Sequence, residues 1–269
     1  MGERRVTDVL IEGLPPTETD LCYQALVNYG AYTSFRVEDG GVRGLDLHLA
    51  RLEASALELF GQPVGEDRLR AFIRNAVADR REAWLRVSLF APDILPRSPL
   101  AEVAPKVMTS VSPPPPPLAT SVRAQVRTYV RNDAHIKHTA IFPLIRARRL
   151  ARQDGFDDVL FADADGLISE GATWNIGFLT GDTVVWPQAP MLDGVAQTLI
   201  RARLSSVGLQ SEVRPLSLGD LAAFDGAFLC NSATPACPIT AVGEHAFAAD
   251  PGRMERIAQA WASNPAQMI

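Results

Sequence analysis

A run of five consecutive prolines at residues 113–117 constrains the fold more than any other feature of this sequence. Proline fixes φ and has no backbone N–H, so the run continues neither a helix nor a central strand. It is typical of a short, stiff, extended connector. We interpret it as a linker rather than a recognition site, because patterned sequence lies on both sides. The predicted parts are an N-terminal α/β domain at residues 1–112, a linker at 113–122 and a larger C-terminal domain at 123–269.

Both halves mix helix and strand signals without regular alternation. Asp39 and Gly40 mark a hairpin turn. Apolar residues recur at helical spacing from Leu47 to Phe60, with Asp46 as the expected N-cap. Further helices are expected at 67–78, 142–153, 196–207 and 254–262, and strands at 9–11, 33–37, 42–45, 83–90, 124–130, 159–162, 167–169, 174–179, 183–186, 212–214 and 227–230. This pattern predicts an α+β fold.

Composition excludes several classes of protein. The chain has 269 residues, 47% of them hydrophobic, and a formal net charge of −5. The negative charge argues against a nucleic-acid partner bound through a basic field. No apolar run is long enough to span a membrane, and the N-terminus lacks the pattern of a signal peptide. We therefore expect a cytoplasmic protein with no membrane or nucleic-acid partner.

The cysteines give no sign of a disulfide framework or a metal site. Cys22, Cys230 and Cys237 are odd in number and stand in apolar sequence, which is typical of reduced thiols. No histidine stands beside Cys230 and Cys237 at ligand spacing, so no zinc is expected. The glycines form no nucleotide-binding motif either.

Lysine is unusually scarce. Lys106 and Lys137 are the only two lysines, and the other 24 basic residues are arginines. Arginine cannot form a Schiff base, whereas a partly buried lysine can lose its proton and act as a nucleophile. The residues alone leave open whether either lysine has a chemical role.

Five segments, taken in chain order, resemble the class IV aminotransferases. These pyridoxal-phosphate (PLP) enzymes of fold type IV include the branched-chain and D-amino-acid aminotransferases and 4-amino-4-deoxychorismate lyase. The segments are Leu47-His48-Leu49-Ala50-Arg51-Leu52-Glu53, Ile136-Lys137-His138, Gly155-Phe156-Asp157-Asp158 through Ser169-Glu170-Gly171-Ala172-Thr173-Trp174-Asn175-Ile176, Leu192-Asp193-Gly194-Val195-Ala196, and Leu229-Cys230-Asn231-Ser232 with Cys237-Pro238-Ile239-Thr240. The resemblance implies the two-domain fold of the D-amino-acid aminotransferases, PLP as the cofactor and a homodimer.

The resemblance also implies roles for the matching residues. Lys137 takes the place of the Schiff-base lysine, and Glu170 that of the carboxylate that keeps the pyridine nitrogen protonated. Arg51 matches the arginine that grips the phosphate, and Ser232 matches a hydroxyl-bearing phosphate ligand. The implied cofactor-binding set also includes Asn175, Val195 and Ala196, the last two at a helix start that offers backbone N–H groups to the phosphate.

Candidate substrate contacts follow in the same way. Arg86 matches a substrate-side arginine of some relatives, and the Tyr29-Gly30 pair resembles the family's substrate-side segment. Ala233 and Thr234 match a turn that meets the substrate carboxylate. The remaining candidates are Arg36, placed near the expected pocket mouth, Tyr32, and Arg97, for which a surface position is expected.

Three positions depart from the aminotransferase pattern. Phe142 stands where many transaminases have a tyrosine, Trp174 where branched-chain enzymes have a second glutamate, and Ala196 where they have a threonine. The first hypothesis is an aminotransferase that moves an amino group between an amino acid and an α-keto acid. The alternatives are a lyase of the aminodeoxychorismate type that releases pyruvate, and a family member that binds PLP without catalysis.

Overall fold

A computed structural model describes residues 8–269, which fold into two compact units. The first unit contains the described residues up to Pro115, together with Ile136–Ala140 and Ala266–Ile269, and the second contains Pro116–His135 and Ile141–Pro265. The predicted domain division follows the chain order, with a break at the linker. In the structure two later segments, one of them carrying Lys137, return to the first unit, because both segments pair with its strands.

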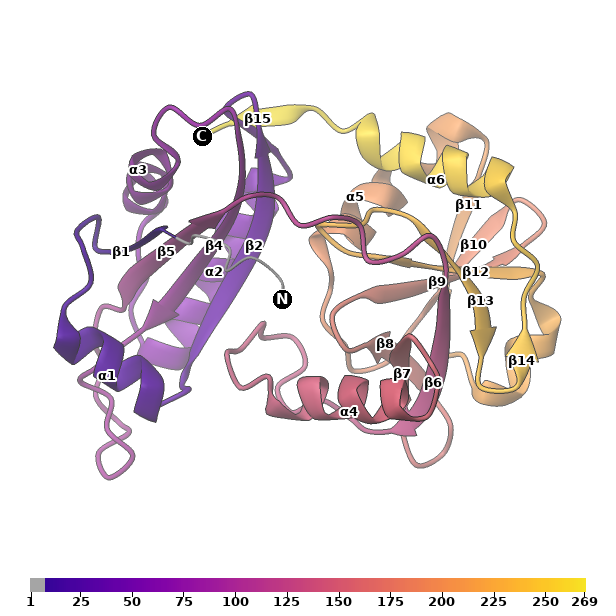
Figure 1. Ribbon diagram of the computed structural model, residues 1–269, viewed down its shortest axis with the longest axis horizontal. Helices are drawn as coiled ribbons and strands as arrows, with labels where there is room; N and C mark the ends of the chain where they lie inside the picture. The colour runs from indigo at the N-terminus through magenta and orange to yellow at the C-terminus, as the bar shows by residue number, and fades with distance from the viewer. Residues whose placement is uncertain (1–7) are drawn as a thin grey trace. The chain divides into compact units, whose positions relative to one another are not determined.

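The first unit is built on a six-stranded antiparallel sheet (Figure 1). In sheet order its strands are β1 (Asp8–Ile11), β5 (Lys106–Ser112), β4 (Glu82–Phe90), β2 (Gly30–Glu38), β3 (Gly41–Arg43) and β15 (Ala266–Met268). Its helices are α1 (Glu18–Leu26), α2 (Leu45–Phe60) and α3 (Glu66–Val77). The predicted hairpin turn is confirmed, because β2 and β3 are joined through Asp39 and Gly40, both at positive φ.

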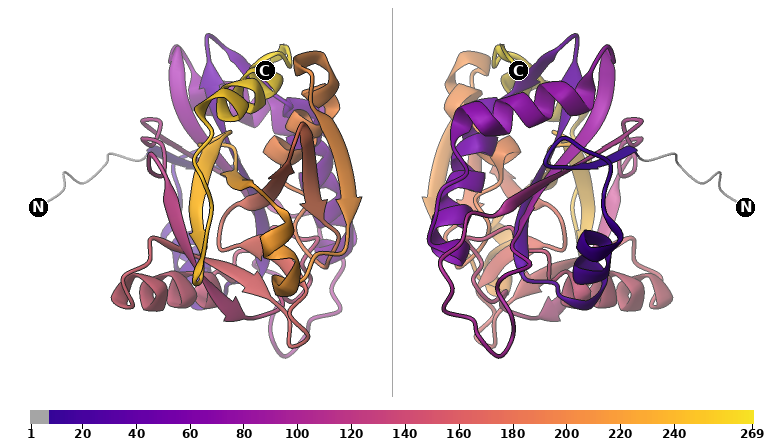
Figure 2. Two further views of the ribbon diagram at one scale, coloured as in Figure 1. Left: turned by 90° about the vertical axis from the view of Figure 1, so that its right-hand side faces the viewer. Right: turned by 90° about the vertical axis from the view of Figure 1, so that its left-hand side faces the viewer.

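The two faces of this sheet differ in polarity. Side chains alternate along a strand, and one face buries apolar residues such as Phe35 and Leu85 against Leu52 of α2 and Ile73 of α3. In the right view of Figure 2, α2 and α3 lie in front of the strands that they cover. The opposite face carries Tyr32, Ser34, Arg86 and Ser88, which we call the polar face.

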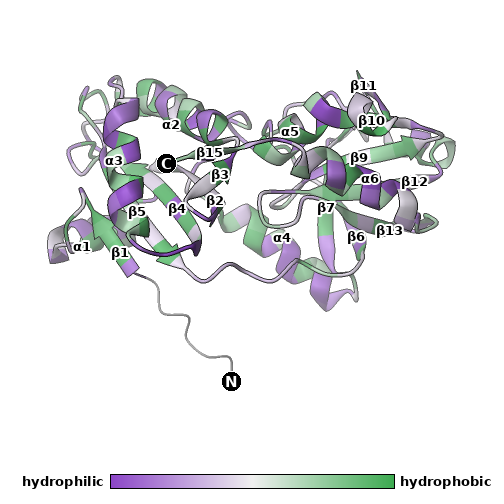
Figure 3. Cartoon of the chain, turned by 90° about the horizontal axis from the view of Figure 1, so that it is seen from above, coloured by the Kyte–Doolittle hydropathy of each residue, from purple (hydrophilic) through white to green (hydrophobic). Residues whose placement is uncertain are grey.

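The second unit contains a nine-stranded mixed sheet. Its main path runs β11 (Gln210–Arg214), β10 (Thr183–Pro187), β9 (Asn175–Thr180), β12 (Gly226–Cys230), β13 (Cys237–Val242), β6 (Val122–Thr128), β7 (Asp158–Ala162) and β8 (Ile168–Gly171), and β14 (His245–Ala246) pairs with β13. The helices are α4 (Phe142–Gln153), α5 (Val195–Arg203) and α6 (Pro251–Ala262), with 3-10 turns at Leu204–Val207 and Leu218–Ala223. Figure 3 shows apolar and polar bands along these helices. The mixture of helices with largely antiparallel strands confirms the α+β class.

Three local expectations need correction. Asp46 is not the N-cap of α2, since Gly44 occupies that position and Asp46 lies in the first turn, where a carboxylate favours the helix dipole. The helix expected at 196–207 begins at Val195 and ends in a 3-10 turn before Gly208. Cys22 is exposed to solvent and does not lie in the apolar surroundings expected for it, whereas Cys230 and Cys237 are buried. All three thiols are free.

The described chain, residues 8–269, has no helix that is both long enough and apolar enough to cross a membrane.

Candidate active site

Lys137 lies on a short segment that pairs with the edge of β2. The Tyr32 amide donates to the Lys137 carbonyl over 2.9 Å, and the Thr139 amide donates to the Gly30 carbonyl over 2.8 Å. These two bonds flank an antiparallel bridge between Ala31 and His138. Residues opposite each other in such a pair share a face, so the Lys137 side chain lies on the polar face beside Tyr32.

Three side chains meet on the polar face. The Lys137 Nζ lies 5.0 Å from the centroid of the Tyr32 ring, and the Arg86 guanidinium carbon lies 3.7 Å from the same centroid. Arg86 Nε also donates to Ser88 Oγ over 3.1 Å. Burial lowers the pKa of Arg86, and the nearby Tyr32 partly offsets this effect. The arrangement therefore places a desolvated guanidinium close to a lysine amine.

His48 stands one turn before Arg51 on α2. His48 is only 2% exposed, and its Nδ1 lies 2.6 Å from Thr33 Oγ1. Burial holds the pKa of His48 well below 6.5, and the positive charges of Arg51 and Lys137 lower it further. His48 is thus a neutral, packed histidine.

Two predicted substrate contacts of the first unit already have protein partners. The Tyr29 hydroxyl donates to the Leu59 carbonyl over 3.0 Å. Arg36 forms ion pairs with Glu38 at 3.1 Å and with Glu82 at 2.8 Å on the exposed end of β2. Arg86 is therefore the better candidate to bind a substrate anion.

In the second unit, Glu170 is nearly buried on β8. It is 6% exposed, and its carboxylate lies 3.8 Å from Nη1 of Arg131, which is 8% exposed. A buried guanidinium so close favours the ionised form of a carboxylate. Arg131 is not among the residues predicted from the sequence, because nothing there distinguishes it among 24 arginines.

The N-terminus of α5 packs tightly against Asn175 of β9. Asn175 Nδ2 donates to the Leu192 carbonyl over 2.8 Å. A Cβ on Gly194 would lie 2.0 Å from Asn175 Oδ1, so only glycine fits there. Among residues 8–269, no side chain forms a capping hydrogen bond at the start of α5. The amides of Val195 and Ala196 in the first turn are therefore left for a ligand, because a helix does not satisfy its first N–H groups.

A turn at residues 231–234 follows β12. Its backbone is held by Asn231 Oδ1, which accepts from the amides of Ala233 and Thr234 over 2.9 and 2.8 Å. Thr234 is buried, and its Oγ1 accepts from the Leu118 amide over 3.1 Å, whereas Ser232 is half-buried. The Thr234 hydroxyl therefore has a structural partner, and Ser232 is the remaining hydroxyl of the turn.

The departures from the family pattern have different structural settings. Trp174 is only 2% exposed. A packed aromatic ring therefore stands where the branched-chain enzymes have a charged glutamate. The Trp174 ring would lie 2.1 Å from a Cβ on Gly171, so this aromatic requires a glycine next to Glu170. Phe142 is 74% exposed at the start of α4. Ala196 is buried in α5.

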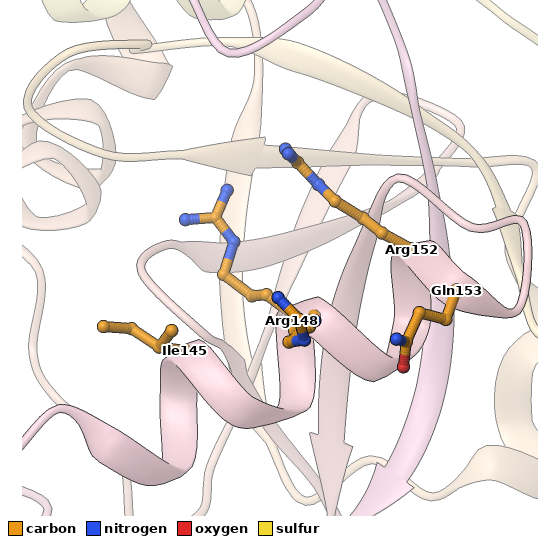
Figure 4. A pocket seen from close by; sticks show the side chains of 5 residues that line it. Ile145, Arg148, Arg152 and Gln153 are labelled. Atoms are coloured by element: carbon orange, nitrogen blue, oxygen red, sulfur yellow. The ribbon is translucent and has the colours of Figure 1, made fainter.

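A separate hollow of about 780 Å³ runs along α4, lined by Ile145, Arg148, Arg149, Arg152 and Gln153 (Figure 4). Arg148 Nη2 pairs with Asp158 at 3.0 Å, and Arg152 donates to the Asp157 carbonyl. Burial raises the pKa of Asp158 despite the charge of Arg148. None of the predicted site residues lines this hollow. In residues 8–269 no group of three His, Cys, Asp or Glu side chains is placed to hold a metal ion.

Comparisons with known proteins agree on a family. The sequence profile described as "Amino-transferase class IV" matches residues 30–242. No curated protein sequence compared with the chain matches it. Solved structures do match, with sequence identities that show the fold alone.

Three of these structures span nearly the whole chain. A branched-chain aminotransferase from Thermoproteus uzoniensis, solved with norvaline, is 19% identical with a TM-score of 0.83, covering 96% of this chain and 94% of its own. The fold IV transaminase CpuTA1 from Curtobacterium pusillum is 22% identical with a TM-score of 0.77, covering 90% and 89%. The PLP-bound form of a hypothetical aminotransferase from Mycobacterium tuberculosis is 21% identical with a TM-score of 0.77, covering 96% and 99%.

The matched profile covers most of the chain, and both sheets belong to a fold that matches fold type IV aminotransferases. This chain is therefore a member of the class IV aminotransferase family, whose related structures bind PLP.

Proposed function

We propose that this protein is a PLP-dependent aminotransferase that moves an amino group between an amino acid and an α-keto acid. The observation that carries the proposal is the position of Lys137 on the polar face, next to Tyr32 and Arg86. The other lysine, Lys106, is paired with Asp20 over 2.7 Å. We assign the Schiff base to Lys137 because it matches the family's lysine position and lies on the polar face beside Tyr32.

The donors of the second unit fit the remaining parts of PLP. The uncapped start of α5, with the amides of Val195 and Ala196, suits a phosphate because backbone N–H groups and the helix dipole favour an anion. Ser232 adds a hydroxyl, and Glu170 a carboxylate suited to a protonated pyridine nitrogen. Asn175 supports the start of α5 through its contact with Gly194. Arg51 is the proposed guanidinium ligand of the phosphate in the first unit.

Each residue then has a distinct task. PLP, when bound, supplies an aldehyde and a ring that accepts electrons from the substrate carbon. Lys137 binds the aldehyde through its amine and moves a proton at the substrate α-carbon. Glu170, beside Arg131, would face the ring nitrogen and hold it protonated. Arg86 binds and orients a substrate carboxylate.

The substrate class follows from the same chemistry. We propose amino and keto acids, and the related structures were solved with norvaline, or with α-ketoglutarate and the amine form of the cofactor. Ala233 and Thr234 are proposed to contribute backbone to the substrate side, and Tyr29 a ring. The homodimer and the cytoplasmic location remain predictions from sequence.

The first experiment compares the visible spectra of the wild type, Lys137→Ala and Lys106→Ala after addition of PLP. We expect a new band in the wild type and in Lys106→Ala, and no such band in Lys137→Ala. Glu170→Gln should retain PLP but lose most amino-group transfer, because an amide does not keep the ring nitrogen protonated. Identical spectra for wild type and Lys137→Ala would overturn the proposal.

Product analysis separates transfer from elimination. A transaminase consumes an α-keto acid in proportion to the new amino acid formed and shows ping-pong kinetics. Release of pyruvate without any keto-acid requirement would replace the transaminase by the lyase.

A further inference from the structure

Tyr32 is contacted by two cations of the polar face, Lys137 and Arg86. Tyr32 lies opposite Lys137 at the edge of β2. On the other side of β2, Tyr32 pairs with Ser88 of β4, and Arg86 pairs with Ser34, so Tyr32 and Arg86 are diagonal neighbours. Diagonal neighbours on one face lie within reach of aromatic side chains. The guanidinium carbon lies 3.7 Å from the ring centroid and the lysine Nζ 5.0 Å. Both distances are within the range of cation–π contacts.

The Tyr32 ring is a main contact of the Arg86 guanidinium, whereas carboxylates hold the guanidinium of Arg36. No carboxylate of the described residues 8–269 forms an ion pair with Arg86, whose other polar contact is Ser88 Oγ. Arg36, further along the same pair of strands, is held by two carboxylates instead. A guanidinium held by a carboxylate has little charge left for a ligand, whereas one stacked on a ring keeps its charge and its in-plane N–H donors.

We propose that Tyr32 is a positioning residue, whose ring holds Arg86 as an anion receptor at a fixed place beside Lys137. The assignment rests on the proposed function only in naming the anion, a carboxylate of the amino-acid or keto-acid substrate. The face of the ring makes both contacts, so phenylalanine can replace tyrosine and an aliphatic residue cannot. Without the ring, the long Arg86 side chain gains rotamer freedom that substrate binding must remove.

The first test needs neither cofactor nor turnover. Phenylglyoxal labels arginines, and mass spectrometry of the digested full-length protein gives the labelling rate of Arg86 relative to the distant Arg97. We expect Tyr32→Leu to raise this ratio several-fold, and Tyr32→Phe to leave it near the wild-type value. Tyr23→Leu, which makes the same change at a ring stacked on Phe90 in the same unit, is the control for general loosening. Equal ratios in wild type and Tyr32→Leu, or equal increases in Tyr32→Leu and Tyr23→Leu, would overturn the proposal.

The second test measures steady-state transamination by the PLP-loaded protein. We expect Tyr32→Leu to raise KM for the carboxylate substrate about fivefold with a smaller change in kcat, because the cation–π contact that holds Arg86 is lost. Tyr32→Phe should restore the wild-type KM. A KM equal to wild type in Tyr32→Leu, or a loss in Tyr32→Phe as large as in Tyr32→Leu, contradicts the role of the ring. If Tyr32→Leu raises the labelling ratio of Arg86 but neither the wild type nor any variant transaminates, the proposed function fails. The placement of Arg86 by Tyr32 then still stands.

Discussion

For single residues of this chain, burial decides how an ionisable side chain behaves as much as the residue type does. His48, Arg86 and Glu170 are all ionisable in isolation, yet each is largely removed from water. His48 stays neutral, Arg86 is stacked on a ring, and Glu170 lies next to Arg131. These differences, invisible in composition, decide which groups can act on a ligand.

His48 should make folding sensitive to mild acid. Its folded-state pKa lies well below 6.5, so the unfolded chain binds the proton more tightly, and stability falls as the pH drops below about 6.5. We expect His48→Gln to flatten the pH dependence of the free energy of unfolding in this range. Urea unfolding at several pH values between about 8 and 5 measures it. Parallel curves for the two proteins would show that His48 does not titrate differently on folding.

The pair between Asp20 and Lys106 should act in a lower pH window than His48, and in the same direction. Hydrogen bonds from Lys106 and Thr17 hold the pKa of Asp20 below 3.8, so the stabilisation is present above that pH and is lost as the pH falls through the folded-state pKa. We expect Lys106→Met to cost about 1 kcal/mol near neutral pH, since Lys106 is partly exposed. Lys106→Arg is the matched control and should retain most of the stability. A cost that is the same in acid as at neutral pH would argue against the ion pair.

At the scale of elements, helix ends and strand edges carry the candidate site. The segment around Lys137 is a one-bridge addition to β2, and the start of α5 lacks a side-chain cap. Periodicity predicted α2 and α4 correctly, because their apolar residues repeat at the helix period, and the turn residues Asp39 and Gly40 predicted the hairpin. It missed α1, whose exposed residues give a weak pattern, and β5 and β15, whose pairing partners are distant in sequence.

Gly194→Ala tests the start of α5. The new Cβ would lie 2.0 Å from Asn175 Oδ1, so Asn175 must move and its bond to the Leu192 carbonyl is strained. We expect a loss of about 1–3 kcal/mol in unfolding free energy, together with weaker PLP binding, measured by denaturant unfolding and by absorbance titration. Gly219→Ala is the control, because its Cβ would meet nothing closer than Ser217 Oγ at 3.5 Å. Equal effects of the two substitutions would refute the tight packing.

At the scale of the whole molecule, the first unit is built from three separate segments of the chain. Residues near Lys137 and the C-terminal strand β15 both return to it after stretches in the second unit. Each return ties the folding of the first unit to residues far along the chain. The sheet of the first unit is therefore complete only when residues 266–268 have paired with β3.

Deleting residues 266–269 should weaken the first unit selectively. The deletion removes the pairing of β15 with β3, the bond from the Asp46 amide to Gln267, and the bond from Arg70 to the Met268 carbonyl. We expect a loss of about 2 kcal/mol, seen by hydrogen exchange as faster exchange in β2, β3 and α2 with little change in β9 and β12. Exchange that rises equally in both units would contradict this assignment.

The fold class, most elements and the family can be predicted from the sequence alone, because periodicity, turn residues and ordered motifs are local properties of the chain. The sequence also singled out Lys137 and Glu170 as chemistry-bearing residues. Only the tertiary structure decided that Arg36 is neutralised by two carboxylates while Arg86 is stacked on Tyr32, and that Arg131 lies beside Glu170. A side chain's ion-pair and hydrogen-bond partners are its neighbours on adjacent strands. A one-residue shift in register would give it different neighbours, and local sequence patterns do not reveal that register.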